Sequence, residues 1–293
     1  MNKHYKRLLK EHKNWMKVLH YSPKTIYSAT NSLTIIFAYF DSKEILNCKK
    51  VTKEQIDEFL SKLKNEKSKR TKRVLSNIQI NSYINELKRL NTYLYLTYNF
   101  SLPINHLELL KVKDTQKEIL TIEEVKQLFE VTTNDKIGLR DKVMLSLYYS
   151  CGLRRDEAIH VNLNDIDLNR RILHIRVSKF NKQRLVPLTE ETVANLKEYL
   201  KNGRPLLQNR LNRKRKTLLL SERGSAIQSQ SLAIRLKVLL KQAKITKNIT
   251  LHSLRHSVAT HLLNKGMETE DISTFLGHSS LESTQIYTHI END

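Results

Sequence analysis

The stretches Arg171-Ile172-Leu173-His174-Ile175-Arg176-Val177 and Gln183-Arg184-Leu185-Val186-Pro187-Leu188 decide the fold. Their alternation of polar and apolar residues predicts two β-strands, joined at Phe180-Asn181. On both sides of this hairpin, apolar residues recur at intervals of three and four, which indicates helices. We therefore expect a mainly α fold that carries one small antiparallel β-sheet.

Helix signals bracket the hairpin in the second half of the chain. Thr121-x-x-Glu124 is a capping box that starts one helix. The segment from Arg140 to Tyr149 is an apolar helix that stops near Gly152. After the hairpin, helices are expected over residues 189–200, 229–243, 253–265 and 270–276.

The first ~100 residues predict a succession of helices. One covers residues 5–19, Ser22-Pro23 opens a second, and Thr52-x-x-Gln55 opens a third. A fourth contains the apolar residues from Ile80 to Leu96 and ends at Leu102-Pro103. Because 293 residues exceed a usual single core of ~100–150, two domains are expected, over 1–110 and 119–293, with a polar linker over 111–118.

Charge indicates the class of partner. The chain has 51 Lys and Arg against 30 Asp and Glu, a net charge of +21. Up to Leu110 there are twenty basic and nine acidic residues, so the excess is spread over both halves. Such a chain repels itself, and an anionic partner explains why the charge is tolerated. Nucleic acid is the leading candidate.

Membrane and secretory signals are absent from the sequence. No apolar run reaches about eighteen residues, and the longest, from Leu33 to Phe40, suits a buried helix. The basic N-terminus is not followed by an apolar segment, so no secretion signal is expected. Cys48 and Cys151 are far apart and form no CxxC motif, which indicates a reduced, cytoplasmic protein.

The sequence also contains the residue types that break a phosphodiester bond without a metal. This reaction needs cations on the non-bridging oxygens, a nucleophile, and an acid for the departing sugar oxygen. Arginine suits the first task because its planar guanidinium stays charged and donates two hydrogen bonds to one phosphate. Four motifs supply such groups: Gly152-Leu153-Arg154-Arg155-Asp156-Glu157, the hairpin Ser178–Leu188 with Lys179, His252-Ser253-Leu254-Arg255-His256, and Leu276-Gly277-His278 with Tyr287 nine residues later.

In this order the four motifs resemble those of the tyrosine recombinase family, most closely the bacterial Xer recombinases and the related phage and transposon integrases. The first resembles the family's first arginine box and the second its lysine-bearing hairpin. The third and fourth resemble its H-x-x-R box and its closing tyrosine motif. The likeness spans essentially the whole chain, which implies an N-terminal core-binding domain and a C-terminal catalytic domain.

The resemblance implies a role for each matching residue. Tyr287 would attack the scissile phosphate and form a 3′-phosphotyrosyl link, freeing a 5′-hydroxyl. Arg154 and Arg255 would clamp the non-bridging oxygens. Lys179 would protonate the 5′-oxygen from a mobile hairpin.

The remaining roles fall to two histidines and a glutamate. His252 would take or hold the tyrosine proton, and His278 would donate a further hydrogen bond to the phosphate. Glu157 lies one helical turn after Arg154, where it could orient an arginine or His252. His252 and Arg255 are three residues apart at a helix start, so both can face one point.

Several alternatives stay open at this level. Lys182 is a rival to Lys179 within the same hairpin, where Ser178 and Phe180 replace the family's frequent glycines. His252 and His256 have a zinc-compatible spacing, but no Glu or Cys pattern completes a site, so no metal is expected. Only six residues follow Tyr287, which leaves the way subunits interlock open.

The expected partner is double-stranded DNA with paired inverted half-sites, bound by a homotetramer, with no membrane and no cofactor. An accessory protein is not identified, nor is integration or excision of a mobile element distinguished from chromosome dimer resolution. A type IB topoisomerase is the rival within the same chemistry. A catalytically silent DNA-binding regulator and a metal-dependent nuclease are the rivals from other classes.

Overall fold

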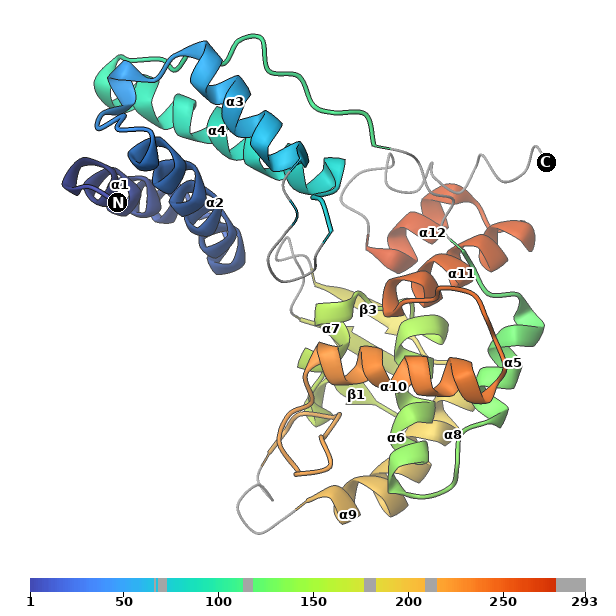
Figure 1. Ribbon diagram of the computed structural model, residues 1–293. Helices are drawn as coiled ribbons and strands as arrows, with labels where there is room; N and C mark the ends of the chain where they lie inside the picture. The colour runs from blue at the N-terminus through green and yellow to red at the C-terminus, as the bar shows by residue number, and fades with distance from the viewer. Residues whose placement is uncertain (66, 68–72, 113–117, 177–182, 209–214, 278–293) are drawn as a thin grey trace. The chain divides into compact units, whose positions relative to one another are not determined.

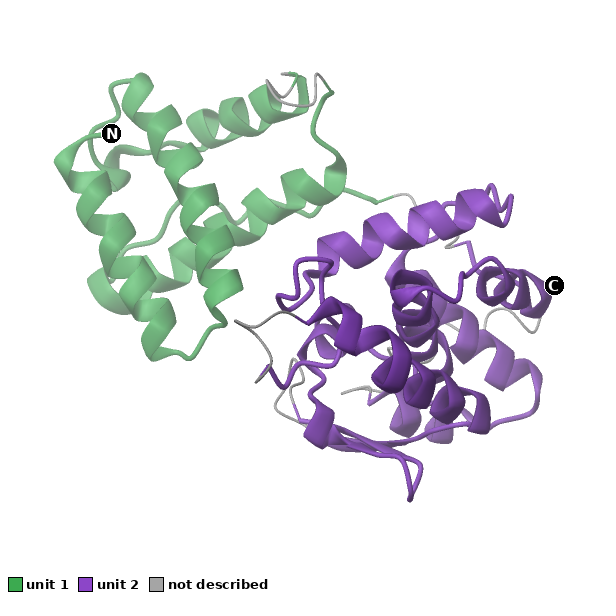
Figure 2. Ribbon diagram, turned by 90° about the horizontal axis from the view of Figure 1, so that it is seen from below, with its two compact units in different colours: residues 1–115 green, residues 116–293 purple. Residues whose placement is uncertain are grey.

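The structure is a computed structural model of the chain, described over residues 1–65, 67, 73–112, 118–176, 183–208 and 215–277 (Figure 1). The chain divides into two compact units, residues 1–115 and residues 116–293 (Figure 2). The described helices include none that is both long and apolar enough to cross a membrane.

Helices form the first unit. They are α1 (Lys3–Val18), α2 (Pro23–Ser42), the short 3₁₀ turn Cys48–Lys50, α3 (Lys53–Asn65) and α4 (Asn77–Tyr98). The apolar run predicted to form a buried helix lies in α2, where Leu33, Ile36, Phe37 and Phe40 are at most 1% exposed. This burial against the neighbouring helices is what stabilises the unit.

The helix starts follow the predicted capping residues. Ser22 accepts a hydrogen bond from the backbone N–H of Thr25, which caps α2. Thr52 and Gln55 exchange reciprocal bonds at the start of α3. The predicted end of α4 at Leu102-Pro103 is wrong: the helix ends at Tyr98, because Asn99 adopts the left-handed conformation (φ 48°) that closes a helix.

Helices also dominate the second unit. They are α5 (Ile122–Glu130), α6 (Lys136–Leu145), α7 (Arg155–His160), α8 (Glu190–Glu198), α9 (Arg204–Leu207), α10 (Ser229–Gln242), α11 (Leu251–Asn264) and α12 (Thr269–Leu276). The predicted apolar helix starts earlier than expected, because Asp135 caps α6 by accepting from the N–H groups of Ile137 and Gly138. It continues as a π-helical turn over Ser146–Ser150.

A small antiparallel sheet in the order β1-β2-β3 completes the second unit and confirms the predicted fold class. The strands are β1 (Ile166–Asp167), β2 (Ile172–Ile175) and β3 (Arg184–Pro187). The predicted hairpin strands are present but shorter, and β1 was not predicted because two residues cannot show an alternation. In the register, Leu173 lies opposite Val186 and Ile175 opposite Arg184.

Helix α11 is held at its start and along its length. Thr250 and Ser253 form a capping box at its N-terminus. Ser257 accepts a hydrogen bond from the N–H of Leu120, and the His261 ring lies 2.9 Å from the Leu120 carbonyl oxygen. These contacts join α11 to the segment around Leu120 at the start of the second unit. They hold the helix, and with it the side chains at its N-terminal end, in place.

Candidate DNA-cleavage site

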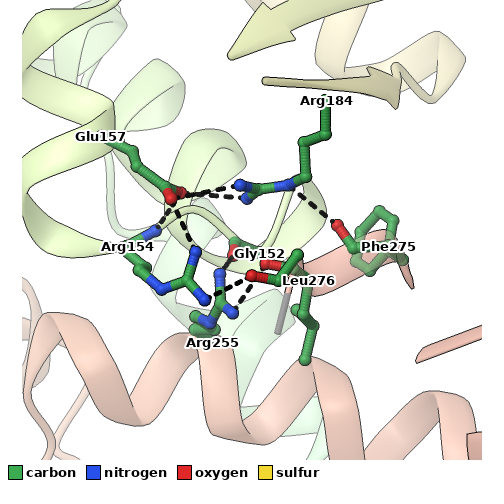
Figure 3. Close-up of polar contacts among 8 residues, drawn as sticks. Gly152, Arg154, Glu157, Arg184, Arg255, Phe275 and Leu276 are labelled. Atoms are coloured by element: carbon green, nitrogen blue, oxygen red, sulfur yellow. Dashed lines mark hydrogen bonds and ion pairs between the residues drawn. The ribbon is translucent and has the colours of Figure 1, made fainter. Parts of the chain in front are cut away.

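The first arginine of the site stands at the start of α7. Gly152 has φ 57°, a left-handed conformation that suits glycine and turns the chain toward Arg154. One oxygen of Glu157, Oε2, accepts from the Arg154 backbone N–H at 2.9 Å. The other, Oε1, accepts from Arg154 Nη1 at 2.8 Å (Figure 3). Glu157 therefore fixes both the backbone and the guanidinium of Arg154.

The second arginine comes from α11 and is almost entirely buried. Arg255 is 2% exposed. Its Nη1 donates to the carbonyl oxygen of Gly152 at 2.5 Å, and its Nη2 donates to that of Leu276 at 2.8 Å (Figure 3). A buried charge is costly unless it is hydrogen-bonded, and these carbonyls supply such bonds. The first bond also ties Arg255 to the turn that carries Arg154.

Both arginines converge on the C-terminal end of α12. Arg154 Nη2 donates to the Gly277 carbonyl oxygen at 2.5 Å, one residue beyond the carbonyl that Arg255 binds. Gly277 ends α12 in the left-handed conformation (φ 65°), so the helix stops at Leu276, where the helix expected over residues 270–276 also ends. The end of a helix exposes carbonyl groups and carries partial negative charge, so two guanidiniums are well placed there.

The histidine of the H-x-x-R motif is exposed at the start of α11. The His252 ring lies 4.3 Å from that of His256, measured between centroids and at 76° between planes. His256 is buried, at 7% exposure. Within the described ranges, no three His, Cys, Asp or Glu side chains cluster in a way that could hold a metal ion.

The other predicted site residues lie outside the described residues. His278 directly follows Gly277, and Tyr287 follows further on. Lys179 and Lys182 fall between β2 and β3, where the described strands end at Ile175 and begin at Arg184. The structure thus brings together Arg154, Glu157 and Arg255 at the residue before His278.

Sequence reasoning missed one member of the site, Arg184 on β3. Its Nη1 and Nη2 donate to the two oxygens of Glu157 at 3.1 and 2.9 Å, and its Nε donates to the Phe275 carbonyl oxygen at 3.1 Å (Figure 3). The alternation of buried and exposed residues along β3 could have indicated that Arg184 points inward. Arg184 shares a face with Val186, which is fully buried, whereas Leu185 between them is exposed.

These contacts keep Glu157 ionised. Burial by itself raises the pKa of this carboxyl, but the hydrogen bonds and charge of Arg184, together with the bonds from Arg154, outweigh burial and hold the pKa below its ordinary value. At neutral pH the ionised carboxylate of Glu157 can therefore act only as a hydrogen-bond acceptor. Both of its oxygens orient arginine donors. A guanidinium has more donors than Arg154 uses in these contacts, so this side chain can also bind an anion.

The comparisons with known proteins show the family of the chain. Residues 118–293 match the phage integrase family. The chain is 32% identical over 273 residues to the tyrosine recombinase XerD of Oceanobacillus iheyensis, covering 92% of this chain and 88% of that protein. It is 39% identical over 187 residues to the XerD of Bifidobacterium longum, covering 61% and 60% of the two chains.

A solved structure shows the same fold. The XerH site-specific recombinase bound to palindromic difH substrate, in a post-cleavage complex, superposes with a TM-score of 0.73 at 23% identity, covering 91% of this chain and 76% of that one. The superposition shows that the two chains share a fold. This chain belongs to the phage integrase family and is a tyrosine-type site-specific recombinase.

Proposed function

We propose that this chain cleaves and rejoins DNA strands at a specific site through a 3′-phosphotyrosyl link to Tyr287. The observation that carries the proposal is the convergence of Arg154 and Arg255 on consecutive carbonyls of Leu276 and Gly277. Two guanidiniums held side by side match the two non-bridging oxygens of one phosphate. The chain then continues directly into His278, and Tyr287 follows nine residues later.

The reaction is a phosphoryl transfer in two balanced steps. Tyr287 Oη forms a bond to phosphorus while the bond to the sugar 5′-oxygen breaks, and Lys179 gives that oxygen a proton. His252 takes the proton that leaves the tyrosine. In rejoining, a 5′-hydroxyl attacks the phosphotyrosine and releases Tyr287. Because one phosphodiester is exchanged for another, the proposal requires no ATP and no metal.

Arg154, Arg255 and His278 stabilise the charge that develops on the phosphate. In this proposal the guanidiniums bind the non-bridging oxygens, and His278 donates a further hydrogen bond. Lys179 is assigned as the acid, with Lys182 as the competing lysine of the same hairpin. Comparing Lys179→Ala and Lys182→Ala on a substrate whose 5′-oxygen is replaced by sulfur decides between them, because a thiolate leaves without needing an acid. The variant rescued by sulfur identifies the lysine.

Double-stranded DNA with paired inverted half-sites is the proposed substrate, bound by a homotetramer. The XerH structure, solved on a palindromic substrate, supports such a site. The net charge of +21 supports a polyanionic partner contacted by both halves of the chain. In this proposal residues 1–110 are the core-binding domain and residues 119–293 the catalytic domain. The cytoplasm is the proposed location, in keeping with free, buried thiols at Cys48 and Cys151.

A suicide substrate tests the proposed function against its rivals. This is a cognate duplex with a nick beside the cleavage site, so that a short fragment diffuses away and the adduct accumulates. Covalent attachment in EDTA that disappears in Tyr287→Phe supports the proposal. A well-bound duplex with no adduct favours the silent DNA-binding regulator, and EDTA-sensitive cutting favours the nuclease. Relaxation of supercoiled plasmid by monomeric protein, without site preference, favours the topoisomerase.

A further inference from the structure

We propose that Arg184 is a positioning residue for catalysis: it holds Glu157 in place, and through Glu157 it orients the phosphate-binding guanidinium of Arg154. The inference rests on the proposed function, since it takes Arg154 as a phosphate ligand. It concerns a residue of β3 that stands next to the hairpin segment carrying Lys179.

The contact between Arg184 and Glu157 has the geometry of a strong, directional pair. Two guanidinium nitrogens each donate to a different carboxylate oxygen, at 3.1 and 2.9 Å. The two side chains are 10% and 2% exposed, so water screens the interaction little. A bidentate pair of this kind fixes the direction of the carboxylate as well as its position.

Each oxygen of Glu157 is shared between the two arginines. Oε1 accepts from Nη1 of Arg184 and from Nη1 of Arg154, and Oε2 accepts from Nη2 of Arg184 and from the Arg154 backbone N–H. Any shift of the carboxylate therefore moves the backbone and the guanidinium of Arg154 together. Phosphoryl transfer is sensitive to such shifts, since a misplacement of ~1 Å costs about a hundred-fold in rate.

Arg184 also fixes the end of α12. Its Nε binds the Phe275 carbonyl oxygen, next to the carbonyls of Leu276 and Gly277 that Arg255 and Arg154 bind. Three guanidiniums thus bind three successive carbonyls at the point where the chain leaves for His278. Arg184 is the member of this set that belongs to the hairpin, so it connects β3, the first arginine box and the end of α12.

The chain offers a matched control in Arg176, on the other side of the same hairpin segment. Arg176 Nε donates to Asp165 Oδ1 at 2.5 Å, and Asp165 is likewise buried and caps a backbone N–H, that of Asn162. The side chain of Arg176 is 59% exposed. Arg176→Gln therefore removes one positive charge from the same hairpin and one arginine contact from a buried carboxylate. It leaves the contacts of Arg154 unchanged.

The test compares single-turnover formation of the covalent adduct on the suicide substrate, with DNA binding measured on an uncleavable duplex. We expect Arg184→Gln to slow adduct formation about a hundred-fold, while DNA affinity changes no more than about threefold. Arg184→Lys, which keeps one charged contact to Glu157, should recover part of the rate. Arg176→Gln should match the wild type. The double variant Arg184→Gln and Glu157→Gln should react little more slowly than the slower of the two single variants, because both substitutions break the same contact between Arg184 and Glu157.

A second readout needs no DNA chemistry. The side-chain Nε–H NMR signal of Arg154 reports the order of its guanidinium, and it should shift and broaden in Arg184→Gln but stay unchanged in Arg176→Gln. An unchanged rate and signal in Arg184→Gln, or an equal loss in Arg176→Gln, overturns the inference. If the wild type forms no adduct, the proposed function fails instead, and the NMR comparison alone decides whether Arg184 positions Arg154.

Discussion

Arg154 and Arg255 bind neighbouring carbonyl oxygens, although the two residues come from helices about a hundred positions apart in the chain. The carbonyls are those of Gly277 and Leu276 at the end of α12. Arg255 is also tied to Gly152, two residues before Arg154. The spacing of the two guanidiniums is therefore set by the protein itself, as preorganised binding of a phosphate in the proposed function requires.

Removing the charge of Glu157 should weaken the second unit. Glu157→Gln leaves Arg184 without its ionised partner in a buried place, which costs about 3 kcal/mol in the free energy of unfolding. Chemical denaturation followed by circular dichroism measures this loss. Glu190→Gln is the control, because the pair of Glu190 with Arg171 is exposed and contributes at most about 1 kcal/mol. Equal stabilities for the two variants would contradict the prediction.

The stability difference between wild type and Glu157→Gln should depend on pH in one direction. Arginine contacts lower the folded-state pKa of Glu157, whose ordinary value is 4.5. A lowered carboxyl pKa stabilises the folded state above the unfolded-state value, and the stabilisation disappears as pH falls through the folded-state value. The difference should be constant from neutral pH down to about pH 5 and shrink below 4.5. Unfolding titrations at several pH values check this, and a difference that grows on acidification would refute it.

Gly277→Ala should harm both stability and cleavage. Its φ of 65° disfavours a side chain, at a cost of about 1 kcal/mol. A Cβ there would also lie 2.9 Å from Arg184 Cδ and 3.0 Å from its Nη1. If the Arg184 side chain moves away, it loses its hydrogen bonds to the Glu157 carboxylate or to the Phe275 carbonyl oxygen.

Gly266→Ala is the matched control for Gly277→Ala. Gly266 also has a positive φ, 81°, but no atom lies within 4 Å of the position of its Cβ. Both variants should lose similar stability from backbone strain, whereas only Gly277→Ala should slow adduct formation, by roughly tenfold or more. Equal cleavage rates in the two alanine variants would show that displacing Arg184 has no consequence.

DNA binding should depend steeply on salt, because both halves of the chain are basic. A protein that neutralises several phosphates loses about a thousand-fold or more in affinity between roughly 50 and 200 mM salt. Fluorescence anisotropy with a labelled duplex measures the slope. A nearly flat dependence would mean that the positive charge serves another partner.

Much of the arrangement of the site follows from the order and spacing of the motifs, because residues close in sequence at one helix start are also close in space. His252 and Arg255 share one helix start, and Glu157 lies one turn from Arg154, so the spacing alone places each pair. The end of α12 at Leu276 agrees with the helix expected over residues 270–276. The roles of all these residues in catalysis, and those of Lys179, His278 and Tyr287, stay predictions.

What the sequence could not give are contacts between distant segments. The bonds of Arg255 to Gly152 and of Arg184 to Glu157 join positions 103 and 27 residues apart, and no periodicity encodes them. The expected partner of Glu157 was an arginine or His252. The structure shows two arginines, one of them on β3, which the alternation of polar and apolar residues predicts only as a strand of the hairpin. The end of α4 was missed because Asn99, not the proline, closes the helix.

The most direct test of the central claim is to identify the residue that carries DNA after cleavage. The suicide-substrate adduct is formed in EDTA, digested with nuclease and protease, and analysed by mass spectrometry. We predict one modified peptide, with the nucleotide joined through its 3′-phosphate to Tyr287, and no adduct in Tyr287→Phe or Arg255→Ala. An adduct on another residue, or one that persists in Tyr287→Phe, would contradict the account.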